Sequence, residues 1–369
     1  MRFLVSPCAY KGTLSALQLC EAISKGIRDA LPDAEILLAP IADGGDGTLD
    51  ALHTAIGGEF RYVDAQDSIG RPVRAKWLSF GETAVIELAS SSGLALILSY
   101  ELLNALMAHT YGLGEVARDA LLTRPKNLFV CVGGSASTDG GAGMLMAMGA
   151  KFFDGNGNSI ELGGNDLFHI RSCDLSELNA LISQSGVESI KVAVDVDNPL
   201  LGEYGAAAVY GPQKGAGIPA VERLNDGLAQ FALVLEAAVG RACKDLPGAG
   251  AAGGTAFGIN AAIGAEMISG FSWLSSVINL EEKISACDVV ITGEGCLDNQ
   301  SISGKAIGEL AKLCTKYGKQ LWAVPAVAVP NVDWHSYGVH KILQTSAHGR
   351  MADEASVQAA AFDLCKLYD

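Results

Sequence analysis

Hydrophobic and polar positions along the first sixty residues predict the order strand, helix, strand, helix. Residues 2–6 form a short apolar run typical of a buried strand, and apolar residues then recur at helical spacing between 17 and 31, ending at Pro32. Ser15 and Gln18 have the spacing of a capping box at the start of this helix. A second strand-like run at 35–39 is followed by a glycine-rich turn and a helix to Ile56. This alternation predicts a parallel sheet.

The pattern changes near residue 60, where strand-like runs follow one another across short turns. The runs at 60–63, 73–80 and 84–88 are joined at Gly70-Arg-Pro and Gly81-Glu, which predicts antiparallel pairing and a different domain. Beyond them we expect helices near 101–108 and 115–122, a strand at 128–132, a helix from 143, a strand at 191–196 and a glycine- and alanine-rich tract at 248–265.

Strands and helices alternate again from residue 288. The expected elements are a strand at 288–292, a helix after 304, strands at 320–324 and near 341–345, and a terminal helix from 353. The two ends of the chain therefore predict one discontinuous Rossmann- or flavodoxin-like parallel-sheet α/β domain, residues 1–60 plus 285–369. A second, mixed α/β domain, residues 61–284, is inserted into it.

Composition narrows the class of protein. Of 369 residues 49% are hydrophobic and 18% charged, which excludes intrinsic disorder. The net charge of −15 disfavours nucleic acid and anionic membranes as partners. The nine cysteines form no C-x-x-C pair, so neither a disulfide framework nor a zinc knuckle is indicated. With no signal-like first segment and no long apolar stretch, we expect a cytoplasmic protein of undefined oligomeric state.

Two turns near the N-terminus carry charged residues between a strand and a helix. Lys11 precedes Gly12 after the first strand, at the sheet edge where α/β proteins bind ligands, and suits contact with a phosphate. Asp43 and Asp46 flank two glycines after the second strand, and such a carboxylate pair suits Mg²⁺ held partly through water. A solvated turn lysine and an aspartate helix cap are the structural alternatives.

Residues 133–143 form the loop with the most biased composition, with five glycines and three hydroxyl side chains after an apolar strand. Backbone N–H groups in such a loop can surround a nucleotide phosphate, although a merely flexible loop is the alternative. The basic turn 210–215, which contains Lys214, is assigned to the same nucleotide function.

The segment 291–305 carries Glu294, Asp298, Gln300 and Lys305 between a strand and a helix. It is not a Walker A loop, because that motif needs G-x-x-x-x-G-K-[ST] and residue 306 here is alanine. A phosphotransferase without a P-loop is therefore the favoured interpretation.

Weaker signals lie elsewhere in the chain. Asp195 follows the strand at 191–196, and the adjoining Asp197 and Asn198 either orient a substrate or form a turn before Pro199. Arg71 could pair with a carboxylate, although turn arginines are usually solvated. Residues 248–253 match G-x-G-x-x-G but follow no strand, so an NAD-dependent hydroxy-acid dehydrogenase is a weaker alternative.

Taken in order, these motifs resemble the glycerate kinase family of the two-domain, non-P-loop type. The resemblance rests on motifs starting at Pro7, Pro40, Ile86, Thr110, Gly133, Asp195, Tyr210 and Thr292 and covers nearly the whole chain. It implies ATP-dependent phosphorylation of glycerate, generally to 2-phosphoglycerate, with Mg²⁺. The chain departs from the family pattern at Ala9-Tyr10 (usually Ser-Phe), at Cys296 (usually arginine) and at Val324-Pro325 (usually Ala-Gly). The missing arginine leaves room for another small hydroxy acid as substrate.

Phosphoryl transfer depends on positioning and charge neutralisation, which gives the candidate residues their expected roles. Which carboxylate accepts the substrate proton and which holds the metal stays open, and a non-catalytic acid- or nucleotide-binding protein is a third possibility. The predicted sets are catalytic Lys11, Asp43, Asp195, Glu294 and Lys305; substrate-binding Arg71, Asp298 and Gln300; nucleotide-binding Gly133, Gly134, Ser135, Ser137, Asp139 and Lys214; and metal-binding Asp43, Asp46 and Asp195.

Overall fold

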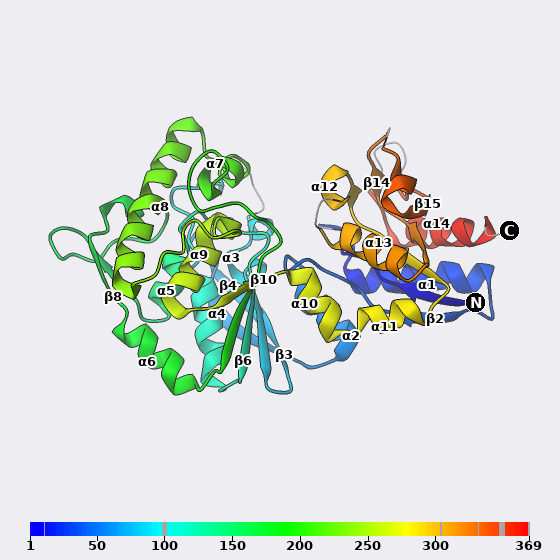
Figure 1. Ribbon diagram of the computed structural model, residues 1–369, viewed down its shortest axis with the longest axis horizontal. Helices are drawn as coiled ribbons and strands as arrows, with labels where there is room; N and C mark the ends of the chain where they lie inside the picture. The colour runs from blue at the N-terminus through cyan, green and yellow to red at the C-terminus, as the bar shows by residue number, and fades with distance from the viewer. Residues whose placement is uncertain (11, 98–101, 303–304, 331, 347–350, 368–369) are drawn as a thin grey trace. The chain divides into compact units, whose positions relative to one another are not determined.

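The computed structural model describes residues 1–10, 12–97, 102–302, 305–330, 332–346 and 351–367, without the side chains of Gln300 and Ile302 (Figure 1). Contacts divide the chain into two compact units. The first unit comprises residues 1–43, 50–57 and 271–369, and the second comprises residues 44–49 and 58–270. The second unit takes in residues 44–49 because Gly44 accepts a backbone hydrogen bond from Gly133 (3.1 Å).

The first unit contains a five-stranded sheet of order β15-β13-β11-β1-β2, in which every pair is parallel. Numbered along the chain, this is the flavodoxin-like order 2-1-3-4-5, which confirms the predicted fold class. Its elements are β1 (Arg2–Val5), α1 (Ala16–Ala30), β2 (Glu35–Leu38), α2 (Thr48–Ile56), α10 (Gly270–Val277), α11 (Leu280–Ser285), β11 (Val289–Thr292), β12 (Cys296–Leu297), α12 (Asn299–Ile302), α13 (Ala306–Lys316), β13 (Gln320–Ala323), β14 (Val327–Ala328), the 3₁₀ turn η5 (Trp334–Tyr337), β15 (Val339–Ile342) and α14 (Glu354–Lys366).

Burial explains why the central strands of this sheet are continuous apolar runs. Phe3 and Val5 pack in the core formed with α1 and α14, while the intervening Leu4 is also fully buried. Strands covered on both faces lose the usual alternation of polar and apolar residues. Gly26 lets α1 approach α14, because a Cβ there would lie 2.3 Å from the Gln358 carbonyl oxygen. The predicted capping box of Ser15 and Gln18 begins α1.

The second unit contains a six-stranded mixed sheet of order β10-β9-β6-β5-β4-β3. The hairpins β3–β4 and β4–β5 are antiparallel, as their glycine turns predicted, and the remaining pairs are parallel. Its elements are β3 (Glu59–Gln66), β4 (Pro72–Phe80), β5 (Thr83–Glu87), α3 (Ala89–Ser92), η1 (Leu94–Leu96), α4 (Tyr111–Leu122), β6 (Asn127–Cys131), α5 (Ala142–Ala147), β7 (Lys151–Phe153), η3 (Asp166–His169), β8 (Ser172–Asp174), α6 (Ser176–Ser185), β9 (Ser189–Ala193), α7 (Ala206–Tyr210), η4 (Pro212–Lys214), α8 (Ile218–Val239), α9 (Ala251–Ile263) and β10 (Glu266–Ile268).

The helix predicted near 101–108 is wrong for the described residues 102–108, where the chain is irregular apart from a turn at residues 105–107. The Asn104 side-chain oxygen accepts the Leu106 N–H (3.2 Å), and its carbonyl oxygen accepts the Met107 and Ala108 N–H groups (3.1 and 2.9 Å), so one turn closes on Asn104 and does not continue as a helix. Within the described ranges, no helix is both long and apolar enough to cross a membrane.

Candidate functional site

The sheet of the first unit changes direction between β1 and β11. β1 connects through α1 to β2 on one side, whereas β11 connects through α13 to β13 on the other. In open α/β sheets, ligands bind outside the carboxyl ends of the strands at such a switch point. The loop after β1 contains the predicted Lys11, which lies outside the described residues, and the loop after β11 contains Glu294 to Lys305.

Backbone hydrogen bonds hold the loop after β11 from two sides. The Cys8 N–H donates to the Gly293 carbonyl oxygen (2.8 Å), and the Ala326 N–H donates to that of Glu294 (3.0 Å). Cys296 and Leu297 then pair in parallel with Val327 and Ala328. The backbone of Glu294 is therefore positioned by the loops that follow β1 and β13.

The Glu294 carboxyl group has an unusual environment. Its Oε1 atom is buried and has no hydrogen-bond partner within the described part of the chain. Burial raises the pKa of Glu294 to about 7, helped by the negative charges of Asp298 and Asp43 and opposed by a hydrogen bond with Ser301 and the charge of Lys305. A carboxyl group that titrates near neutral pH is suited to accept a proton from a substrate hydroxyl.

The other predicted residues of this loop are Asp298, Lys305 and Gln300. The Asp298 Oδ1 atom accepts the Ser301 N–H (3.0 Å) and hydroxyl (3.2 Å), so this carboxylate caps α12. Lys305 begins α13 as its N-cap residue and lies close enough to oppose the rise in the pKa of Glu294. Gln300 belongs to α12, but its side chain lies outside the described part of the structure.

In the second unit, two glycine-rich turns predicted separately lie in contact. The strands β5, β6 and β9 are parallel, so the loops after them leave the same edge of the sheet. A Cβ at Gly133 would lie 2.4 Å from the Gly45 Cα, and one at Gly44 would lie 2.6 Å from the Ala193 Cβ. Only glycine permits this approach, which places the turn 44–47 against the loop 133–143.

Two of the three predicted metal ligands lie at this edge. Asp46 is exposed, with its Cβ 4.0 Å from the position that a Cβ on Gly134 would take. Asp195 follows β9, and its Oδ1 accepts the Gly270 N–H (3.0 Å). Asp43 belongs to the first unit, where its charge acts on Glu294. No group of three Asp, Glu, His or Cys side chains among the described residues could hold a metal ion.

This donor set fits Mg²⁺ bound through phosphate but not a protein cage. Mg²⁺ usually takes one or two carboxylates and completes its shell with water and phosphate oxygens. Asp46 and Asp195 are the side chains of the second unit that could supply those carboxylates.

Lys214 lies in the interior instead of on the surface. Its side chain is buried to 2% exposure, and its ammonium donates to the Ser135 hydroxyl (2.8 Å) and to the Ser137 carbonyl oxygen. Burial lowers the pKa of Lys214 to about 7, although the negative charge of Asp139 opposes this. The lysine thus anchors the loop that contains Ser135 and Ser137.

Asp139 is also fully buried, where it joins two helix starts. Its Oδ2 accepts the Thr110 N–H and hydroxyl (both 2.8 Å) and the Gly143 N–H (3.2 Å). These donors precede or open α4 and α5, where a negative charge is favoured by the helix dipole. The contacts give Asp139 a role in shaping the loop.

Arg71 contacts a carboxylate of its own unit. Its Nε donates to the Asp67 Oδ2 (2.6 Å) and its Nη2 to the Leu96 carbonyl oxygen (3.0 Å). Asp67 is buried, yet the hydrogen bonds from Arg71 and Ile69 outweigh desolvation and lower the pKa of Asp67. These bonds hold the turn between β3 and β4.

The glycines at 248–253 have packing roles. A Cβ at Gly250 would lie 2.2 Å from the Pro199 carbonyl oxygen, and one at Gly253 would lie 2.2 Å from that of Ser137. Asn198 accepts the Gly250 N–H (2.9 Å) with its carbonyl oxygen and donates its side-chain amide to Tyr204, so it stabilises the same region. Asp197 is exposed. Close packing therefore explains the glycine spacing without a dinucleotide.

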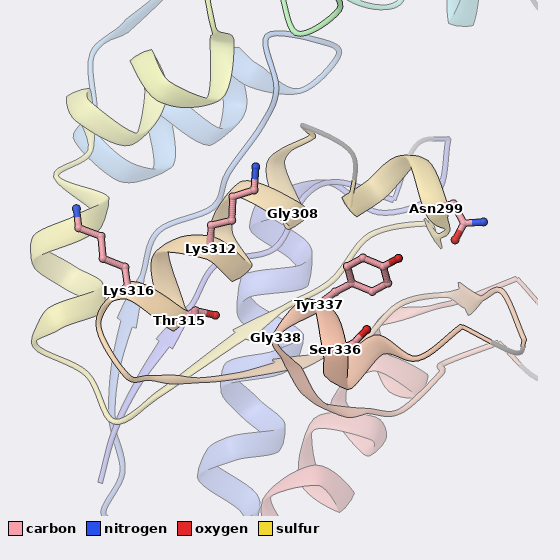
Figure 2. Close-up of a pocket in the computed structure, with 8 residues that line it drawn as sticks. All are labelled: Asn299, Gly308, Lys312, Thr315, Lys316, Ser336, Tyr337 and Gly338. Atoms are coloured by element: carbon pink, nitrogen blue, oxygen red, sulfur yellow. The ribbon is translucent and has the colours of Figure 1, made fainter.

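A separate cleft of about 890 Å³ runs along α13 in the first unit (Figure 2). Two of its lining lysines are held in surface ion pairs, Lys312 with Glu309 and Lys316 with Glu281. Asn299, next to the Asp298 cap, is the lining residue that adjoins the predicted site; the full lining is Asn299, Gly308, Lys312, Thr315, Lys316, Ser336, Tyr337 and Gly338.

Comparison with known proteins decides the family. The model of the glycerate kinase family matches residues 3–367. The chain belongs to the glycerate kinase family. It is 38% identical to the glycerate 2-kinase of Escherichia coli K12, covering 99% of this chain and 96% of that protein. It is 39% identical to a glycerate kinase of Halalkalibacterium halodurans, covering 88% and 84%.

A solved structure shares the fold of this family member. The crystal structure of a protein named glycerate kinase 2 from Salmonella typhimurium LT2 superposes with a TM-score of 0.85 at 34% identity. The match covers 100% of this chain and 98% of that one. The resemblance inferred from sequence motifs is thereby confirmed.

Two buried residues of this member of the glycerate kinase family were not identified from its sequence. Glu87, at the end of β5, is 3% exposed and accepts the Thr48 N–H (2.8 Å) at the start of α2. Tyr10 is 1% exposed and donates its hydroxyl to the Val324 carbonyl oxygen. The apolar contexts Ile86-Glu-Leu and Ala9-Tyr indicated burial, but the partners lie far away in sequence.

Proposed function

We propose that this enzyme transfers the γ-phosphoryl group of ATP to the 2-hydroxyl of glycerate, forming 2-phosphoglycerate and ADP. Family membership and the 38% identity to a glycerate 2-kinase over nearly the whole chain support the substrate and the transfer. The observation that carries the chemistry is the Glu294 carboxyl group, whose buried Oε1 has no hydrogen-bond partner among the described residues and whose pKa is raised to about 7. The cytoplasm, which contains ATP, is the proposed location.

The residues of the first unit supply the proton acceptor and a positive charge. Glu294 accepts the proton of the glycerate hydroxyl as its oxygen bonds to phosphorus, and the bond from the γ-phosphorus to the bridging oxygen of ADP breaks. Lys305, whose charge acts on Glu294, stabilises the negative charge of the glycerate carboxylate or the transferring phosphoryl group. Lys11 is proposed for the same task from the sequence alone.

The residues of the second unit hold the nucleotide. The loop at 133–141 offers backbone N–H groups to phosphate oxygens, and Lys214 keeps that loop in shape from the interior. Mg²⁺, when bound, neutralises phosphate charge, and Asp46 and Asp195 would hold it directly or through water. Asp43 is proposed to act electrostatically on Glu294.

An ADP-release assay coupled to NADH oxidation tests this proposal. Purified protein is supplied with ATP, Mg²⁺ and a panel of two- and three-carbon hydroxy acids, with omission of each component as a control. We expect ADP release that depends on D- or L-glycerate. Release that is independent of any hydroxy acid, or greater with another acid, would contradict the substrate assignment.

A further inference from the structure

Tyr10 leaves β1 and turns into the core of the first unit. Its N–H donates to the Leu14 carbonyl oxygen (2.8 Å), and its own carbonyl accepts the Leu14 N–H (3.1 Å) and the Thr13 N–H (2.9 Å). The side chain is 1% exposed. The backbone around Tyr10 is thus closed into a tight turn from which the phenol ring extends inward.

The Tyr10 hydroxyl joins loops that are distant in sequence. It donates to the carbonyl oxygen of Val324, the residue that follows β13, and it also hydrogen-bonds with the Thr345 side chain. The Val324 N–H donates to Thr292 (2.8 Å) at the end of β11. The hydroxyl therefore joins the loop after β1 to the loop after β13, and a separate backbone bond joins Val324 to the end of β11.

These groups crowd the residue directly before Glu294. A Cβ on Gly293 would lie 2.4 Å from the Val324 carbonyl oxygen and 3.4 Å from the Tyr10 hydroxyl oxygen. Burial, reinforced by the negative charge of Glu294, raises the pKa of Tyr10, so its hydroxyl stays a neutral donor at working pH. The bond is therefore present throughout the range in which Glu294 titrates.

We propose that Tyr10 is a positioning residue for Glu294, because its hydroxyl bond to Val324 clamps Gly293 and keeps the Oε1 atom of the following, half-buried carboxyl group shielded from solvent. The inference rests on the proposed function of Glu294. Among the described residues, the charged groups that act on Glu294 are Lys305, Asp298 and Asp43. The charge of Glu294 in turn acts on the Tyr10 hydroxyl from the loop after β1.

The test is the variant Tyr10→Phe, which removes the hydroxyl and keeps the ring. Once the clamp loosens and water reaches Glu294, we expect kcat/KM for glycerate to fall about tenfold, less than the roughly hundredfold cost of an ångström of misplacement. In the plot of kcat/KM against pH, the acid limb should move to a pH about one unit lower, because desolvation is the main cause of the raised pKa of Glu294. If Tyr10 had a purely structural role, Tyr10→Phe would lower Tm and leave the acid limb of the pH profile unchanged.

Tyr317→Phe is the matched control, since it removes a hydroxyl that donates to Glu281 (2.5 Å) in the same unit. Its profile should equal that of the wild type. Should Tyr10→Phe fail to fold, Thr345→Val removes the second partner of the same hydroxyl and should shift the limb in the same direction by less.

The two levels of the proposal fail separately. The positioning role alone would be overturned if Tyr10→Phe has a wild-type kcat/KM and an unmoved acid limb while Glu294→Gln is inactive. Where Tyr10→Phe does not fold, the same result in Thr345→Val would overturn it. A fully active Glu294→Gln would overturn the proposed function of Glu294 itself.

Discussion

Replacing Glu294 by glutamine should separate stability from activity. Glutamine keeps the shape of the side chain but has no charge to desolvate. In the wild type the folded-state pKa of about 7 exceeds the ordinary value of 4.5, so between these values the folded state holds a proton that the unfolded chain has lost. Stability therefore falls as pH rises through this window.

The size of the effect follows from the pKa difference. The rise from 4.5 to about 7 corresponds to about 3 kcal/mol at most, since one pKa unit is about 1.4 kcal/mol. Wild type and Glu294→Gln should be similarly stable near pH 4.5, and above pH 7 the variant should be more stable by up to about 3 kcal/mol. Its kcat should fall by about 10²- to 10⁴-fold, the usual contribution of a positioned base.

Urea denaturation of both proteins at several pH values between 4.5 and 8, paired with ADP-release rates, measures both effects. Taking the difference between wild type and variant cancels the other titrating groups. A stability difference that does not change with pH would refute the electrostatic account of Glu294. A variant within threefold of the wild-type kcat would refute its role as the base.

Four further substitutions test neighbouring assignments. Lys305→Ala should lower kcat/KM at least tenfold with an unchanged circular dichroism spectrum, because a charge near the reacting groups is lost. Lys214→Met should raise the KM for ATP several-fold more than it changes kcat, since the anchor of Ser135 and Ser137 is removed. Gly253→Ala should lower the free energy of unfolding by more than about 2 kcal/mol, because its Cβ would lie 2.2 Å from the Ser137 carbonyl oxygen. Cys296→Ser should leave kcat/KM within twofold, because partial desolvation and the negative charges of Asp298 and Glu294 raise the pKa of the Cys296 thiol and keep it neutral.

The fold was predictable where local pattern and topology agree. Apolar runs such as Phe3 to Val5 and the glycine turns at Gly70 and Gly81 are local signals, and such signals predicted every strand of the two large sheets except β10. The helix α8 (Ile218–Val239) was not placed, although its buried residues recur at helical spacing from Leu224 to Leu235. The helix predicted around Asn104 is wrong, because the backbone and side-chain hydrogen bonds to Asn104 close a single turn that does not continue.

The sequence predicts which segments contain the candidate residues, but it does not predict the burial or the contacts of their side chains. The motif around Glu294 marks the loop after β11. The environment of Glu294 depends on hydrogen bonds from Cys8 and Ala326, which lie in other loops, and no local spacing encodes those contacts. The same holds for Lys214, which reads as a surface lysine in a polar turn and is buried in the structure. Asp298 and Asp139 carry the residue types of a binding site, whereas their contacts include helix starts.

The most direct test of the central claim is phosphorus NMR of the product formed from ATP, Mg²⁺ and glycerate by the wild-type enzyme and by Glu294→Gln. We predict a signal from 2-phosphoglycerate with the wild type, and none above background with the variant over the same time. A 3-phosphoglycerate signal would contradict the assigned acceptor hydroxyl. Equal product from both proteins would contradict the role of Glu294 in the transfer.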